Sequence, residues 1–137
     1  MTDNMNICVD GQQTCDTQSD RITLQTTGAL FSKGNAWYIT YSERDDEGGE
    51  IPVTLKLQPD RALMIRSGAA RMEFCPGMDT VCDYRTSAGT LTLQVRTHAV
   101  IASLSPSGGS VELIYSLFAG QELLSKNDVQ IILTPLA

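Results

Sequence analysis

The sequence is poor in the residues that enzymes use most often for proton transfer, because its 137 residues include a single histidine, His98. Catalytic arrangements of the Ser-His-Asp or Cys-His kind would all depend on that one side chain. Glycine-rich phosphate loops of the G-x-x-x-x-G-K or G-x-G-x-x-G kind are also absent. We therefore expect no catalytic residue and no cofactor. An enzyme with His98 or a cysteine close to a carboxylate in a cleft is the disfavoured alternative.

Long apolar runs are lacking as well. No run approaches the roughly 18 apolar residues that a membrane-spanning helix needs. The N-terminal stretch MTDNMNICVDGQQ has no basic region followed by an apolar one, which a secretory signal would require. The expectation is a cytoplasmic protein without a membrane partner.

Positive charge is scarce, and the net charge is −6. Phosphate contacts need a dense set of Lys and Arg side chains, so no nucleic-acid partner is expected. The stretch 61–97 is the exception, because it carries five basic and three acidic groups, whereas residues 1–60 carry four and ten. These side chains either lie on solvated outer faces or share an anion-binding patch. All five basic groups are arginines: Arg61, Arg66, Arg71, Arg85 and Arg96.

The four cysteines form two C-x6-C pairs, Cys8 with Cys15 and Cys75 with Cys82. Neither spacing is that of a zinc site, so no metal is expected there. Each pair flanks a predicted turn, and Cys75 and Cys82 could face each other across a hairpin at a separation that suits a disulfide. A reducing compartment favours free thiols. The acidic loop 45–50 should be mobile and lacks the ligand spacing of an EF-hand.

No stretch combines a helical period with capping residues, whereas period-two alternation recurs along the chain. The stretch 61–97 predicts a tight antiparallel meander, because four alternating runs are separated only by turn-sized punctuation. Gly28 predicts a bend in a strand over 21–32, and Asp10-Gly11 predicts a reversal. A change of parity near His98 predicts a bulge in the stretch 89–104. The remaining predicted strands cover 4–9, 36–44, 51–58, 110–119 and 123–133.

This pattern predicts an all-β fold: a single domain over residues 1–137, built as one antiparallel β-barrel of about eight to ten strands. Closure suits such a chain because it removes the exposed edges of the sheet. A barrel of this size encloses either packed side chains or one small ligand.

The order of several short motifs over about ninety residues resembles that of one family. The motifs are Tyr38-x-x-Tyr41, Thr54-Leu55-Lys56, Ile65-Arg66-x-Gly68, Met72-x-Phe74, Tyr84-x-Thr86-x-x-Gly89-Thr90-Leu91-x-Leu93, Thr97, Tyr115-x-Leu117 and Asn127-x-Val129-x-Ile131. In this respect the chain is similar to the YwiB-like family of small bacterial β-barrels, which are grouped with the calycins and uncharacterised in function. The resemblance implies a calycin-like or lipocalin-like barrel and no established catalytic residue.

The wider calycin group includes lipocalins and avidins, which bind small ligands in the mouth of the barrel. Their Gly-x-Trp signature is not matched here, since the closest stretch is Gly34-Asn35-Ala36-Trp37. A ligand role taken from that likeness would rest on the fold alone.

Seven polar residues of the predicted strands are candidates for a ligand site. If several point inward, they would give a small cavity a cationic floor with phenol donors, which suits a carboxylate or a phosphate. Alternatively, the basic side chains point outward and the phenols bond to the backbone. Parity does not decide, because Arg66 is in phase with Met64 but not with Leu63 and Ile65. The seven are Tyr41, Lys56, Arg66, Tyr84, Thr86, Thr97 and Tyr115.

The favoured function is a non-enzymatic binding module for a small anionic or amphipathic ligand in the barrel. The alternative is a structural or protein-interaction barrel with a filled interior and an apolar outer patch from Ile114, Phe118 and Leu124. The first predicts a pocket lined by Arg66 and a tyrosine, and the second predicts none.

Overall fold

The computed structural model describes residues 2–44 and 47–136, and within them the chain forms ten β-strands and no helix. This part of the chain therefore holds no helix that could span a membrane. Neighbouring strands are antiparallel throughout, so the predicted all-β fold is confirmed at the upper end of the expected strand count. The strands are β1 (Met5–Cys15), β2 (Gln18–Lys33), β3 (Ala36–Arg44), β4 (Glu50–Leu57), β5 (Ala62–Arg66), β6 (Ala70–Phe74), β7 (Asp79–Thr86), β8 (Gly89–Ser105), β9 (Gly108–Ala119) and β10 (Glu122–Pro135).

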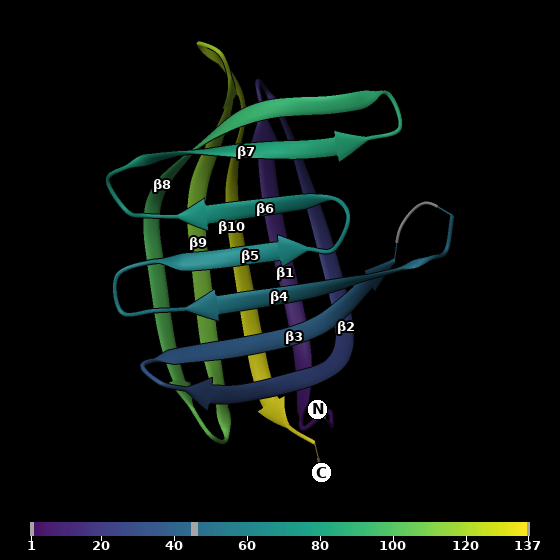
Figure 1. Ribbon diagram of the computed structural model, residues 1–137, viewed down its shortest axis with the longest axis vertical. Coiled ribbons are helices and arrows are strands. Elements are labelled where there is room, and N and C mark those ends of the chain that lie inside the picture. The colour runs from purple at the N-terminus through teal and green to yellow at the C-terminus, as the bar shows by residue number, and fades with distance from the viewer. Residues whose placement is uncertain (1, 45–46, 137) are drawn as a thin grey trace.

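The strands form one continuous sheet in the order β6-β5-β4-β3-β2-β1-β10-β9-β8-β7. The sheet wraps round on itself, so that β3 to β7 cross in front of β1, β8, β9 and β10 (Figure 1). Its two end strands meet through bonds outside the ladder. The Arg85 amide donates to the Ala69 carbonyl at 2.9 Å, and the Thr80 hydroxyl donates to the Glu73 carbonyl at 2.6 Å. The result is the predicted barrel, nearly closed.

Two long strands bend from one layer into the other. Strand β2 pairs with β1 up to Gly28 and with β3 from Ala29 onward. At the bend, a Cβ on Gly28 would lie 2.1 Å from the Thr40 carbonyl oxygen, so the predicted close backbone approach is confirmed. Strand β8 shifts register between Thr97 and Ala99, which confirms the bulge predicted at His98.

The predicted reversal at Asp10-Gly11 is wrong, because β1 runs on to Cys15 and the chain turns at Asp16, which has a left-handed φ of 53°. The physical reason is that β1 is hydrogen-bonded on both sides, by β2 and by β10, along this stretch. Pairing on both edges outweighs the local turn preference of the Asp-Gly pair. The paired Cys8 and Cys15 therefore lie in one strand and do not flank a turn.

All four cysteines are free thiols, the state that the sequence analysis favoured. Cys75 lies in the loop that joins β6 to β7, and Cys82 lies in β7 opposite Leu93 of β8. The proposed hairpin between the two cysteines is therefore not formed.

Side chains fill the space between the two layers. Phe74, Ile39, Leu55 and Leu113 are fully buried and belong to one apolar cluster that draws on strands of both layers. These residues sit at the positions that the period-two alternation assigned to one face. The interior is thus a packed core, and any site must lie at its margins.

Replacing Gly28 with alanine should destabilise the protein by about 2–4 kcal/mol, because the added Cβ would collide with the Thr40 carbonyl and with Ile7. Gly11→Ala is the matched control, since the nearest atoms to its Cβ are 3.9 Å away. Urea unfolding of both variants measures the difference. Equal stabilities would contradict the account of the bend.

Candidate functional site

Three inward-facing side chains form a row across the front layer. Tyr41 of β3 lies opposite Val53 of β4, and Val53 lies opposite Arg66 of β5. Arg66 shares its parity with the buried Ala62 and Met64, so the structure places it on the inner face. Of the two orientations that the sequence left open for Arg66, the structure therefore shows the inward one.

Glu43 holds this guanidinium in an ion pair. Arg66 Nε donates to Glu43 Oε1 at 2.8 Å, and the two side chains are 27% and 31% exposed. Burial lowers the pKa of Arg66, but the hydrogen bond and the charge of Glu43 outweigh it, so that the Arg66 pKa is raised. Arg66 therefore stays charged at the margin of the core.

Two buried phenols lie beside this ion pair. Burial raises the pKa of Tyr41 to about 12, and the charge of Glu43 adds to the rise while Arg66 opposes it. Burial also raises the pKa of Tyr115, against the charge of Arg66. The Tyr115 ring packs on Phe74 with centroids 4.9 Å apart. Both phenols are consequently protonated hydrogen-bond donors at neutral pH.

A second polar row lies on the inner face of the back layer. Thr97 of β8 lies opposite Tyr115 of β9, which in turn lies opposite Asn127 of β10. Thr97 is 2% exposed, and within the described residues its Oγ1 has no hydrogen-bond partner. A buried hydroxyl in this state costs free energy, so it is a feature to be explained.

The structure does not bring all seven predicted residues together. Lys56 alternates with the buried Leu55 and Leu57, so it points outward, and its Nζ lies 5.7 Å from the centre of the Tyr38 ring. Thr86 is exposed and donates to the Gly89 carbonyl in the turn between β7 and β8. Of the two placements left open by the sequence, the structure shows an outward one for Lys56 and an exposed one for Thr86.

Tyr84 shares the inner face of β7 with Cys82 but is only half-buried. Tyr41, Arg66, Thr97 and Tyr115 are the predicted residues that line the margin of the core. With Glu43 they make up what we call the Arg66 cluster.

Sequence reasoning missed two polar residues of this region, Glu43 and Asn127. Glu43 continues the alternation of Ile39 and Tyr41, so parity alone could have placed it on the inner face of β3. Asn127 shares the parity of the buried Ile131 and donates to Ser125 Oγ at 3.0 Å.

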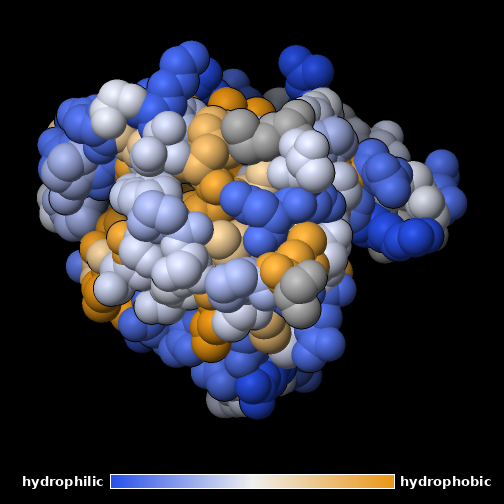
Figure 2. Space-filling model, turned by 90° about the horizontal axis from the view of Figure 1, so that it is seen from below, coloured by the Kyte–Doolittle hydropathy of each residue, from blue (hydrophilic) through white to orange (hydrophobic). Residues whose placement is uncertain are grey.

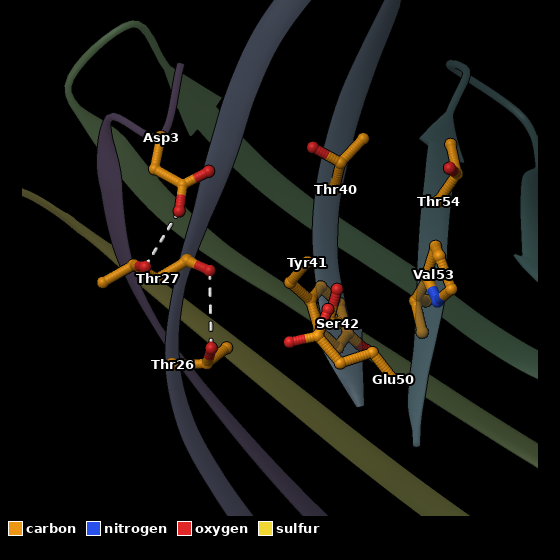
Figure 3. A pocket seen from close by; sticks show the side chains of 10 residues that line it. Asp3, Thr26, Thr27, Thr40, Tyr41, Ser42, Glu50, Val53 and Thr54 are labelled. Carbon is orange, nitrogen blue, oxygen red and sulfur yellow. Dashed lines mark hydrogen bonds between the residues drawn. The ribbon is translucent and has the colours of Figure 1, made fainter. Parts of the chain in front are cut away.

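A depression of about 380 Å³ opens where β2 leaves β3 (Figure 3). Hydroxyl and carboxylate groups line much of it, including Thr26, Thr40, Asp3 and Glu50. Tyr41 also borders it, whereas Arg66 does not. The depression therefore lacks the cationic floor expected for an anion.

A second depression of about 370 Å³ is lined by the apolar residues Trp37, Leu57, Val100 and Leu104 together with polar groups, among them Asn35 and Gln58. Its residues come from the start of β3, the end of β4, the turns next to them and the second half of β8. Seen from below, apolar side chains are exposed among the polar ones at this end of the barrel (Figure 2). Neither depression contains His98.

His98 lies exposed at the β8 bulge, and its Nε2 is 2.9 Å from Ser116 Oγ. Ser116 is 3% exposed, and neither side chain lines the depressions described above. The disfavoured enzyme alternative predicted His98 or a cysteine close to a carboxylate in a cleft, and His98 lines neither of the two depressions described above.

Asp45 and Asp46, whose loop lacks the spacing of EF-hand ligands, lie outside the described residues. Across the remaining chain, no group of three His, Cys, Asp or Glu side chains is placed to hold a metal ion.

Comparison with known proteins identifies similar chains. Residues 7–131 match the family described as a domain of unknown function (DUF1934). The uncharacterized beta-barrel protein YwiB of Bacillus subtilis is 30% identical over 109 residues, which are 78% of this chain and 76% of that protein. The crystal structure of the Bacillus subtilis ywiB protein superimposes with a TM-score of 0.88 at 24% identity, over 98% of this chain and 93% of that one.

Tyr41 should make stability fall with rising pH above pH 10. Its pKa is about 12 in the folded protein and near 10 when unfolded, so the unfolded chain loses the proton first. The contribution of protonated Tyr41 to the free energy of unfolding is fully present below pH 10, and about 2–3 kcal/mol of it is lost by pH 12. Urea unfolding from pH 9 to 12 should show a smaller fall in Tyr41→Phe. A gap between the two proteins that stays constant with pH would contradict this.

Proposed function

The chain belongs to the family described as a domain of unknown function (DUF1934), as its resemblance to YwiB-like barrels predicted, and we propose that it is a non-enzymatic module that binds a small anionic or amphipathic ligand. The ligand would bind at the Arg66 cluster, on the margin of the packed core. The predicted calycin relationship and cytoplasmic location remain predictions, as does the absence of nucleic-acid and membrane partners.

One observation carries the proposal: an inward-facing guanidinium lies beside two buried phenols, and one of these, Tyr115, lies opposite Thr97, whose buried hydroxyl has no partner among the described residues. Apolar side chains of similar volume often replace a buried ion pair at no cost in stability. Polar groups that do not serve stability are therefore candidates for binding. Most of the other buried residues of the described chain are apolar, with Ser116 and Ser125 as polar exceptions.

The chemistry of the Arg66 cluster favours an anionic oxygen. A guanidinium has five N–H donors in a fixed fork, and the bond to Glu43 uses the one on Nε. The Tyr41 and Tyr115 phenols add neutral donors. Phe74 is fully buried and packs on Tyr115, so it holds the ring of that phenol in place.

Access to the Arg66 cluster is favoured by the divergence of β2 and β3. Pairing between these strands begins at Ala29 and Thr40, so the last residues of β3 are paired on the β4 side and not with β2. Glu43 and Arg66 lie at this end of the front layer and are each about one-third exposed. Part of the guanidinium and part of the carboxylate are therefore open to solvent.

The alternative function, a structural or interaction barrel without a ligand, is supported by the packed interior. The three residues of its expected apolar outer patch, Ile114, Phe118 and Leu124, are each half-buried. The Arg96 guanidinium lies 4.6 Å from the centre of the Phe118 ring. The two functions differ in one respect, because the alternative predicts no saturable anion binding.

Octanoate should bind the full chain, and Arg66→Met should weaken that binding about tenfold or more, because charge-assisted hydrogen bonds to the carboxylate are lost. Titration followed by NMR measures both affinities. Arg71→Met is the control, since Arg71 is an exposed arginine on the neighbouring strand β6. Thermal unfolding checks that each variant folds, and Arg66→Lys provides a second variant that keeps the charge.

Two results would count against the binding module. One is the absence of saturable octanoate or phosphate binding by the unmodified protein, which would favour the filled structural barrel. The other is equal loss of binding in Arg66→Met and Arg71→Met, which would indicate a diffuse effect of surface charge.

A further inference from the structure

We infer that Glu43 is a built-in competitor for the ligand, whose carboxylate occupies Arg66 when the site is empty and is displaced when an anion binds. This inference rests on the proposed function, because it concerns the same guanidinium. It assigns to Glu43 control over affinity and not a part in holding the ligand.

The geometry supports this assignment first. The Glu43 carboxylate accepts a hydrogen bond from Arg66 Nε at 2.8 Å, which is the contact that a ligand carboxylate would make. Glu43 therefore makes with Arg66 the same contact that we propose for the carboxylate of the ligand.

The position of Glu43 allows it to move. It precedes Arg44, the last residue of β3, and its side chain is 31% exposed. A side chain at the end of a strand can rotate to solvent without opening the core, whereas Tyr41, two residues earlier, is 7% exposed and cannot.

The charge of Glu43 extends over the whole Arg66 cluster. Besides its bond to Arg66, it raises the pKa of Tyr41 and that of Tyr115, which come from opposite layers of the barrel. A second anion placed between these phenols would feel the same charge as repulsion. Like charges brought together in this way strongly disfavour binding.

Two neighbouring glutamates permit a matched test. Glu50 begins β4 directly across from Arg44, so it lies at the same end of the front layer as Glu43. It is exposed and borders the outer depression, and Arg66 does not. Neutralising either glutamate changes the net charge equally, but only Glu43 contacts Arg66.

The experiment compares octanoate affinity in the unmodified protein, Glu43→Gln, Glu50→Gln and the double variant Glu43→Gln/Arg66→Met, by NMR titration. Glu43→Gln should bind octanoate about tenfold more tightly, because the competing charge is gone while a hydrogen-bond acceptor for Arg66 remains. Glu50→Gln should stay within about twofold of the unmodified protein, since its charge lies outside the cluster. The double variant should lose the gain.

A second readout does not depend on any substitution. The Arg66 Nε–H signal of the unmodified protein should move when octanoate saturates the site, because its acceptor changes from Glu43 to the ligand. A parallel titration with inorganic phosphate distinguishes a carboxylate head group from a phosphate one, and Arg66-dependent binding of either supports the inference if Glu43→Gln tightens it.

The failures are distinguishable. If octanoate binding depends on Arg66 but Glu43→Gln binds no more tightly than the unmodified protein, Glu43 merely positions Arg66, and the inference falls while the proposed function stands. If neither the unmodified protein nor Glu43→Gln binds octanoate or phosphate, both fall. Equal tightening in Glu43→Gln and Glu50→Gln would also overturn the inference, because net charge would explain it.

Discussion

The continuity of backbone hydrogen bonding through the bends of β2 and β8 is the constraint on which the rest of the barrel depends. Each of these strands pairs in both layers, so the sheet can turn without leaving two separate sheets with open margins. At Gly28 the turn requires an approach too close for any side chain, and at Thr97 it requires a shift of register. The bends also place the two inner faces against each other.

The bends explain why polar groups gather where they do. Each inner face becomes polar near the place where one of the long strands turns, since Tyr41 follows the residue that crowds Gly28 and Thr97 adjoins the β8 bulge. Away from these places the two faces interdigitate as apolar side chains. The Arg66 cluster is thus a product of the same geometry that closes the barrel, and its charge is tolerated because Glu43 neutralises it.

The alternation of apolar and polar residues predicted most strands of this fold, because nearly every inward-facing position in a packed barrel needs an apolar side chain. It succeeded for β3, whose bounds match the prediction, and it located the bulge at His98. It failed at Asp10-Gly11, where pairing on both edges outweighs a local turn preference that is all a sequence window contains. For Arg66 two parities were open, and only the packing of Met64 selected one. For Lys56 and Glu43, in contrast, the alternation of neighbouring residues is enough to predict the orientation. It indicates an outward side chain for Lys56 and an inward one for Glu43.

A packed interior and a ligand site are compatible if the site uses the margin of the core. Fully buried Leu55 and Phe74 hold the strands rigid, so Tyr41, Arg66 and Tyr115 are fixed relative to one another before any ligand arrives. Such preorganisation favours small ligands, because little conformational entropy remains to be lost. It also implies that the adjustable part of the site is the Glu43 carboxylate, which is about one-third exposed, and not the sheet. Affinity would then be set by the exchange of one carboxylate for another at a single guanidinium, a balance that a change of one charge can shift without altering the fold.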